Sequence, residues 1–160
     1  MNSIQFSLYS PTADGDRSLH ELMDAAFIEY SRALSGDPTR ERPPWDLPEL
    51  LSGKEIWIAQ LNGAQIGCVV LSEEKDVTDI SFLAVLPAHQ GKGIGSWMLE
   101  EIERVLSARK VKRLTLHTAA IMEGNLRLYE RFGFVETHRK VPEDRLDTIP
   151  RVYMDKKLSE

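Results

Sequence analysis

Cysteine is almost absent from this chain, with Cys68 the only one among 160 residues. A single cysteine cannot form an intramolecular disulfide, and it makes a cysteine-based metal cluster implausible. Cys68 lies in the apolar run Ile66–Leu71, which is typical of a buried strand, so we expect an inert structural thiol. The sequence therefore predicts neither a disulfide scaffold nor a metal site.

Positive charge and long apolar runs are lacking as well. Lys and Arg total 20 against 25 Asp and Glu, which gives a formal net charge of -5. This balance disfavours a nucleic-acid partner, because the neutralisation of phosphates supplies most non-specific affinity for nucleic acids. No apolar run approaches the roughly 20 residues that span a bilayer, and no basic stretch leads into an apolar core near the first residues. We therefore expect a cytoplasmic protein with no membrane partner.

What is present is the composition of an ordinary globular domain. Hydrophobic residues make up 42% and charged residues 28% of the chain. A mass of 18.2 kDa suits one domain with a substantial core and is too small for two. Because no repeat or low-complexity tract divides the chain, we expect residues 1–160 to form a single domain.

Hydrophobic periodicity predicts a mixed α/β fold. The run Ser18-Leu19-His20-Glu21 has the form of a capping box and predicts the start of the first helix, with His20 in its first turn. Asn62-Gly63 predicts a tight hairpin turn. Apolar spacing predicts strands at 5–9, 55–61, 64–71, 77–85, near 114–116, from 134 and at 151–157, and helices from 18, at 93–108 and at 125–131.

The segment from Ser35 to Pro48 is irregular, since it holds four of the eight prolines. Such a stretch cannot be one continuous helix or a central strand. Two interpretations remain open: a surface connection with Trp45 packed against the body, or a lid over a binding cleft.

The strongest local pattern is a glycine-rich turn between an apolar strand and an amphipathic helix. It reads Gln90-Gly91-Lys92-Gly93-Ile94-Gly95-Ser96. Glycines in such a turn allow a ligand to approach the backbone closely, and they let successive N–H groups point into one concavity. Because the positive end of the following helix dipole lies at the same place, the turn suits a pyrophosphate.

Two common phosphate-binding loops do not fit this turn. A Walker A loop ends in Gly-Lys-Ser/Thr, whereas Lys92 precedes Gly93-Ile94-Gly95 here. A dinucleotide-binding turn needs glycine where Ser96 stands, and it needs an acidic residue at the end of the next strand, where Leu116-His117-Thr118 offers none. The turn instead resembles, without a gap, the Gln/Arg-x-x-Gly-x-Gly turn of the GNAT superfamily of acyl-CoA-dependent N-acyltransferases.

The resemblance extends beyond the turn. Residues 77–87 resemble the central strand of the superfamily, 93–108 its pyrophosphate-binding helix and 114–118 the next strand. The run from Asn125 to Phe134 resembles its second signature, an Asn followed by Leu-Tyr and Gly-Phe. Many members carry that Asn seven residues before the Tyr, where this chain has Met122, and Asn125 fits a Met-x-x-Asn variant.

This resemblance implies a GNAT-like α/β fold of the α+β type: a mixed central sheet with flanking helices, in which two parallel strands splay apart. The pantetheine arm of acetyl-CoA would lie between these strands, against their free backbone groups. The residues implied in binding acetyl-CoA, with no metal, are Leu83, Val85, Gln90, Gly91, Lys92, Gly93, Ile94, Gly95, Ser96, Asn125 and Tyr129.

Direct acetyl transfer requires a neutral amine, a polarised carbonyl and a stabilised thiolate. The resemblance places Tyr129 near the cofactor sulfur, which makes it the candidate acid for the thiolate. His117 stands where some relatives have a Glu assigned as base, and histidine titrates in the useful range. Asp79, Glu73 and Glu74 are rival bases, and a site that binds an already neutral amine needs none.

A basic cluster, Arg109, Lys110, Lys112 and Arg113, lies between a predicted helix and strand. It could contact the adenosine 3′-phosphate, or it could be a solvated turn.

The sequence thus predicts an N-acetyltransferase that moves the acetyl group of acetyl-CoA directly to a primary amine of a small molecule or peptide. A non-catalytic acyl-CoA-binding module and the transfer of a longer acyl group are the alternatives. We expect the first helix, segment 35–48 and residues 137–150 to form the acceptor pocket, and the net acidity weakly favours a cationic amine. Cys68 lies away from both signatures, which argues against an acyl-cysteine intermediate. A homodimer through the late strands stays open.

Overall fold

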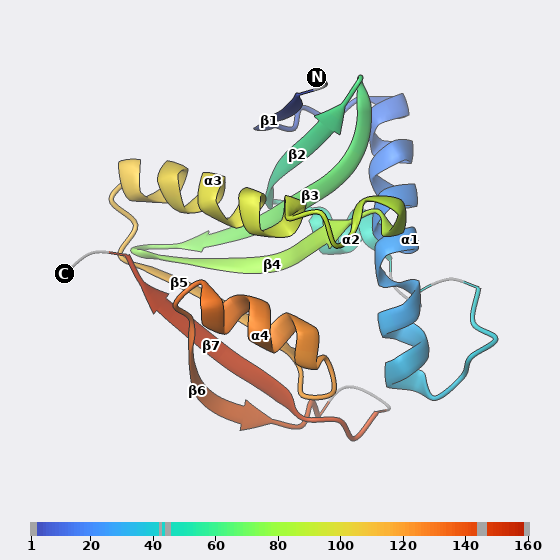
Figure 1. Cartoon of the computed structure of the whole chain (residues 1–160), viewed down its shortest axis with the longest axis vertical. Coiled ribbons are helices and arrows are strands. Elements are labelled where there is room, and N and C mark those ends of the chain that lie inside the picture. Colours follow the sequence, from blue (N-terminus) through green and yellow to red (C-terminus); the bar gives the residue numbers. More distant parts are fainter. Residues whose placement is uncertain (1–2, 42, 44–45, 144–146, 159–160) are drawn as a thin grey trace.

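The computed structural model describes residues 3–41, 43, 46–143 and 147–158, which form a seven-stranded mixed sheet flanked by helices (Figure 1). The strand order is β1-β2-β3-β4-β5-β7-β6. The elements are β1 Ile4–Leu8, α1 Ala13–Ser35, α2 Leu47–Leu51, β2 Glu55–Leu61, β3 Ala64–Glu74, β4 Val77–Val85, a 3-10 turn Pro87–His89, α3 Ile94–Ala108, β5 Arg113–Ala119, α4 Glu123–Arg131, β6 Val135–Lys140 and β7 Arg151–Lys157.

The helices cover both faces of the sheet, because its central strands are apolar on both sides. In β3, Val69 and Leu71 pack in the core under α3, whereas Cys68 and Val70 pack in a second core under α1 and α2. This period of two is what a strand buried on both faces requires. Cys68 is fully buried, which confirms the buried strand thiol expected from the sequence, and burial raises its pKa to about 12.

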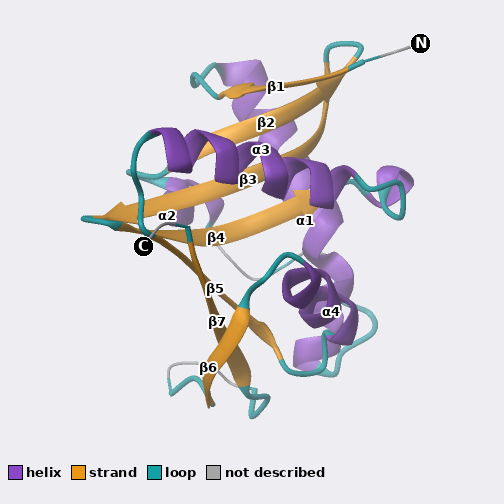
Figure 2. Cartoon of the chain, turned by 60° about the vertical axis from the view of Figure 1, so that its left-hand side comes forward, coloured by secondary structure: helices purple, strands orange, loops and turns teal. Residues whose placement is uncertain are grey.

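The predicted splay of two parallel strands is confirmed between β4 and β5. They pair only from Val77 to Asp79 on β4 and from Arg113 to Thr115 on β5, and beyond that point they diverge. On its other side β4 stays paired with β3 as far as Val85, apart from one register shift. Figure 2 shows β5 turning away from β4, with β7 and β6 following it. A gap in the sheet therefore opens at the end of β4.

The predicted start of the first helix is wrong. Helix α1 begins at Ala13 and not near Ser18, because Thr12 caps it: the Thr12 side chain accepts a hydrogen bond of 2.9 Å from the Gly15 amide. Two acidic residues in the first turn add a favourable interaction with the helix dipole. His20 consequently lies in the interior of α1 and not in its first turn.

A short helix that the sequence did not predict begins at the end of the proline-rich segment. Helix α2 starts after Asp46, whose side chain accepts from the Glu49 amide at 3.3 Å, and it buries Leu47 and Leu51. The packing of Trp45 expected for a surface connection lies outside the described residues, and the choice between a surface connection and a lid stays open. The hairpin predicted at Asn62-Gly63 is confirmed, with both residues at positive φ.

Candidate active site

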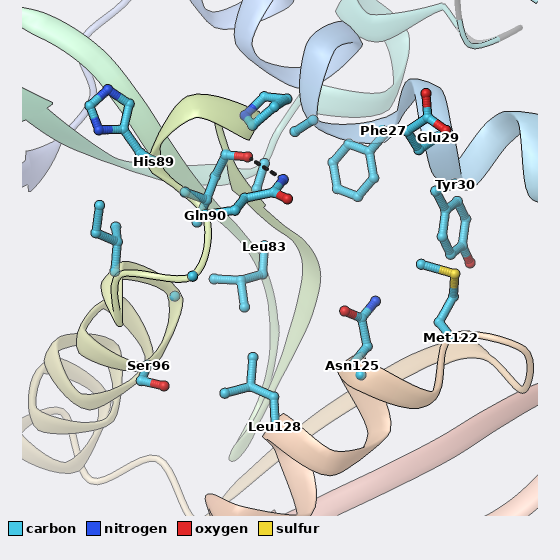
Figure 3. A pocket seen from close by; sticks show the side chains of 18 of the residues that line it. Phe27, Glu29, Tyr30, Leu83, His89, Gln90, Ser96, Met122, Asn125 and Leu128 are labelled. Atoms are coloured by element: carbon cyan, nitrogen blue, oxygen red, sulfur yellow. Dashed lines mark hydrogen bonds between the residues drawn. The ribbon is translucent and has the colours of Figure 1, made fainter.

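A cavity of about 720 Å³ lies where the splayed strands, α1, α3 and α4 converge. Its walls come from the middle of α1, the end of β4, the glycine turn and one face of α4 (Figure 3). This volume is in the range of small-molecule binding sites. Most of the predicted cofactor-binding residues meet here: Leu83, Val85, Gln90, Gly91, Gly93, Ile94, Gly95, Ser96, Asn125 and Tyr129.

The glycine turn presents an uncapped helix start to this cavity. Gly91 and Gly93 have φ values of 76° and 81°, which side-chain-bearing residues rarely adopt. A Cβ added at either would meet nothing within 4 Å, so open space adjoins both. Gly93 is the N-cap of α3 and makes no side-chain capping bond. The amides of the first α3 turn and the helix dipole therefore face a site that favours an anion.

The side chain of Gln90 ties this turn to the end of β4. Its Nε2 donates to the Val85 carbonyl oxygen at 2.9 Å, the contact drawn in Figure 3. A carbonyl oxygen accepts two hydrogen bonds, so Val85 keeps one lone pair for a ligand. Gln90 thus holds the turn and the strand end in one arrangement.

The edge of β4 that faces the gap offers backbone groups to an extended ligand. Leu83 and Val85 pair with Val69 and Gly67 of β3, whereas the β4–β5 register ends at Asp79. Buried N–H and C=O groups need a partner, and a pantetheine arm with its amides suits this edge. Gly67 keeps the strands close, because a Cβ there would lie 3.1 Å from the Ala84 carbonyl oxygen.

Tyr129 lies on the opposite wall, in α4, with only 8% of its surface exposed. Burial raises its pKa above the ordinary value, and the neighbouring Tyr30 adds to the rise. Its ring packs edge-on against Phe134 at 5.8 Å between centroids, which fixes its direction. The phenol is therefore neutral at physiological pH and available as a hydrogen-bond donor.

Asn125 lies one turn before Tyr129 on the same face of α4. Its Nδ2 donates to the Thr118 hydroxyl of β5 at 3.4 Å. That bond connects the cavity-facing side of α4 to the strand that diverges from β4.

His117 and its rivals lie away from the described lining of the cavity. His117 is exposed on β5 and stacks on Tyr153 of β7 at 5.1 Å between centroids. Asp79 accepts from the Thr115 hydroxyl at 2.7 Å, and Glu73 accepts from Arg109 at 2.9 Å. The structure therefore places none of His117, Asp79 and Glu73 in the cavity wall beside Tyr129.

Two other predicted contacts fall elsewhere. Lys92 is exposed and borders a smaller hollow of about 330 Å³ beside Trp97. Of the two interpretations of the basic cluster, the solvated turn is favoured, because Arg109 follows the C-terminal end of α3, about 22 Å from its N-terminus. Arg109 instead pairs with Glu55 and Glu73.

Sequence reasoning missed several residues of the cavity wall. Leu128 and Arg131 of α4 line it together with Asn125 and with Met122, the N-cap residue of α4, and these four recur at intervals of three. On α1, residues 25–27, 29 and 30 line it. The helical spacing on α4 was a readable signal, but only the fold shows which face of each helix turns to the gap.

Among residues 3–41, 43, 46–143 and 147–158, no group of three or more His, Cys, Asp or Glu is placed to hold a metal ion. Within the same residues, no helix is both long and apolar enough to cross a membrane.

Comparison with known proteins places this geometry in a family. The acetyltransferase (GNAT) family matches residues 18–134. Among solved structures, the ribosomal-protein-S18-alanine N-acetyltransferase of Escherichia coli superposes with a TM-score of 0.76 at 18% identity, covering 98% of this chain and 96% of that one. A GNAT acetyltransferase of Elizabethkingia anophelis with acetyl-CoA bound gives 0.69 at 21% identity, covering 96% and 97%. A Bacillus subtilis acetyltransferase in complex with CoA gives 0.72 at 18% identity, covering 98% and 100%.

The chain belongs to the GNAT acetyltransferase family, because the matched region spans most of its length. Its fold is the one shared by the solved acetyltransferases, and membership supports acyl-CoA-dependent N-acetyltransferase activity in general terms. Both the predicted family and the predicted fold class are thereby confirmed.

Proposed function

We propose that this protein transfers the acetyl group of acetyl-CoA directly to the primary amine of a small molecule or peptide. The observation that carries the proposal is the meeting of three features in one cavity: the uncapped start of α3, the unpaired edge of β4 and the buried phenol of Tyr129. Each suits one part of the reaction.

The first two features suit the donor. The amides at the start of α3 would bind the pyrophosphate of acetyl-CoA, and open space beside Gly91 and Gly93 leaves room for it. The amides of the pantetheine arm would pair with the backbone of Leu83 and Val85, in the way that another strand would. The thioester would then lie in the gap, beside Tyr129.

In the reaction, the amine nitrogen attacks the thioester carbonyl, the new C–N bond forms and the C–S bond breaks. The phenol of Tyr129 donates its proton to the departing sulfur. A free phenol is a weaker acid than a thiol, so complete transfer costs about 2 kcal/mol. Burial raises the Tyr129 pKa and increases this cost, which favours donation in concert with C–S cleavage. The nitrogen loses one proton to solvent water, and solvent water returns one proton to the Tyr129 phenolate, so the protons balance over the reaction.

The proton lost by the amine has no assigned acceptor within the cavity. His117 stays the candidate base from the sequence, acting through water, and binding of an already neutral amine is the simpler route. A covalent acyl-enzyme on Cys68 is disfavoured, because that thiol is fully buried with a pKa of about 12.

Steady-state kinetics of Tyr129→Phe test this assignment. With acetyl-CoA and an amine that the wild type acetylates, we expect kcat to fall about 10²- to 10⁴-fold while the Kd of acetyl-CoA changes little. Tyr9→Phe, which also loses a phenol but lies outside the cavity, serves as the matched control and should keep kcat. Equal rates in wild type and Tyr129→Phe would remove Tyr129 from the chemistry.

The same assay tests the length of the acyl chain that the protein transfers from CoA. Hexanoyl-CoA in place of acetyl-CoA should give a lower kcat/KM, and a higher value would replace acetyl by a longer acyl group. Tight binding of acetyl-CoA without turnover of any amine would favour a non-catalytic acyl-CoA-binding module.

A further inference from the structure

The two ends of the cavity differ in chemistry. The end at the glycine turn is polar, with Gln90, Ser96 and the amides of α3. The other end lies between α1 and α4, where Phe27, Tyr30 and Met122 line the wall; we call this the aromatic end. In Figure 3 the Tyr30 ring stands above the Met122 thioether, and the Phe27 ring lies between Tyr30 and the glycine turn. In the proposed function, acetyl-CoA occupies the polar end of the cavity and leaves the aromatic end to another ligand.

The rings at the aromatic end are held in place by other rings. Phe27 packs edge-on against Tyr30, with 6.2 Å between centroids, and edge-on against Phe82 at 5.6 Å. Both geometries are the favoured T-shaped arrangement. A wall fixed in this way loses little conformational entropy when a ligand binds, so it selects by shape.

This wall lies close to the reacting centre. Phe27 and Tyr30 share the cavity with Tyr129, and the electrostatic influence of Tyr30 contributes to the raised pKa of Tyr129. A ligand resting on the aromatic end would therefore reach the thioester with a chain of only a few atoms.

Carboxylates, lysines and arginines are few along the described lining of the cavity, which has Glu29 and Arg131. Glu29, one position before Tyr30, is the one carboxylate among the described residues that line the cavity. Its side chain is 79% exposed and pairs with Arg32 at 2.6 Å, so its attraction for a cation is modest. The aromatic faces add a second, weak attraction for an ammonium group.

We propose that the acceptor is a small primary amine carried by a short chain on a flat apolar group, an arylalkylamine in chemical class, whose ring lies at the aromatic end formed by Phe27, Tyr30 and Met122. Rings and a thioether make favourable contacts with such a group. A polyamine fits poorly, because its additional ammonium groups would be buried against apolar walls without partners. This inference rests on the proposed function.

A panel of four amines tests the inference with the full-length protein and acetyl-CoA. The panel consists of 2-phenylethylamine, n-butylamine, spermidine and an alanine-initiated hexapeptide. We expect kcat/KM for 2-phenylethylamine to exceed that for spermidine and for the hexapeptide by at least about tenfold. The variant Phe27→Leu, which keeps an apolar side chain without the ring, should reduce kcat/KM for 2-phenylethylamine about fivefold. Its kcat/KM for n-butylamine should fall less, since that amine has no ring to lose a contact, so the ratio of the two kcat/KM values should drop in Phe27→Leu.

The outcomes separate this inference from the proposed function. Preference for spermidine or the hexapeptide overturns the arylalkylamine assignment and leaves amine acetylation standing. An unchanged ratio between 2-phenylethylamine and n-butylamine in Phe27→Leu overturns the role of the aromatic end. Acetyl-CoA binding with no acetylation of any amine overturns the proposed function and this inference together. Calorimetric binding of acetyl-CoA by Phe27→Leu shows whether that variant is folded. Glu29→Gln, on the exposed side of α1, provides a second variant. We expect it to lower kcat/KM for 2-phenylethylamine two- to threefold in low salt.

Discussion

Replacing Gly93 by alanine separates the backbone strain of the glycine turn from its role in binding. Gly93 has φ of 81°, and a Cβ built there meets nothing within 4 Å. Alanine at this position therefore suffers left-handed backbone strain and no clash in the free protein. Strain of this kind costs about 1–2 kcal/mol, which lowers Tm by roughly 2–8 °C in a chain of this size.

Gly53 provides a matched control for that strain. Its φ is 73°, a Cβ there also meets nothing within 4 Å, and it lies in the turn before β2, outside the lining of the cavity. We expect Gly53→Ala to lower Tm by a similar amount and to bind acetyl-CoA as the wild type does. Any loss of binding seen only in Gly93→Ala then comes from the site itself.

The expected binding effect follows from the geometry of the turn. A methyl group at Gly93 enters the open space in which we place the pyrophosphate, so we expect acetyl-CoA to bind at least tenfold more weakly. At a concentration 100 times the wild-type Kd, the ligand stabilises the wild type by about 2.7 kcal/mol and the variant by about 1.4 kcal/mol. Their ligand-induced Tm shifts should therefore differ by roughly 3–5 °C.

Differential scanning calorimetry of the three proteins, with and without acetyl-CoA, measures both effects at once. The reasoning about the turn fails if Gly93→Ala retains the full ligand-induced shift. It fails equally if Gly53→Ala loses as much of the shift as Gly93→Ala does.

Two further predictions concern stability. Because burial raises the Cys68 pKa from about 9 to about 12, the folded protein holds this proton more tightly than the unfolded chain, and the stability from this group is complete below pH 9 and falls as pH rises towards 12. Urea unfolding should show the wild type losing about 1 kcal/mol more than Cys68→Ala between pH 8 and pH 10, and parallel losses would contradict it. Asp147→Ala leaves Arg151, whose side chain is 4% exposed and bonded to Asp147 at 2.9 and 3.0 Å, as a buried unpaired cation, so we expect a loss of about 3–5 kcal/mol. Arg151→Met added to Asp147→Ala should recover most of that loss in thermal unfolding, and no recovery would show that the pair acts through something other than its charge.

The glycine turn at one end of the cavity was predictable from sequence because its signals are local. Three glycines in six residues, an apolar strand before them and an amphipathic helix after them determine a turn whose geometry depends little on the rest of the chain. The turn at Asn62-Gly63 was predictable for the same reason. Tyr129 and Asn125 followed from a second short signature in one helix.

The start of α1 was not predicted, because two caps compete in the sequence. Both Thr12 and Ser18 precede helix-forming residues, and the capping box at Ser18 has the stronger pattern. The structure uses Thr12, and contacts from outside the helix hold the added turn: Gln65 of β3 donates to the Gly15 carbonyl oxygen at 3.2 Å, and the Tyr9 hydroxyl donates to Asp16. Tertiary packing, which no local pattern contains, decides between the two.

The α1 wall of the cavity, where we propose that the acceptor binds, was predictable only as a region. The sequence pointed to the first helix, but which of its side chains line the cavity depends on the direction that Phe27 and Tyr30 take. That direction depends on where β4 and β5 separate, and the separation depends on pairings between residues over thirty positions apart. The spacing of apolar residues along the sequence does not predict pairings between such distant residues.

Mass spectrometry of the acceptor tests the central claim most directly. The protein is incubated with acetyl-CoA and 2-phenylethylamine, n-butylamine, spermidine or the alanine-initiated hexapeptide, and both the N-acetylated amine and free CoA are quantified over many turnovers. The account predicts that at least one amine accumulates as its acetamide in equal amount to the CoA released, with Tyr129→Phe far slower. Tight binding of acetyl-CoA with no acetamide from any of the four amines would contradict it.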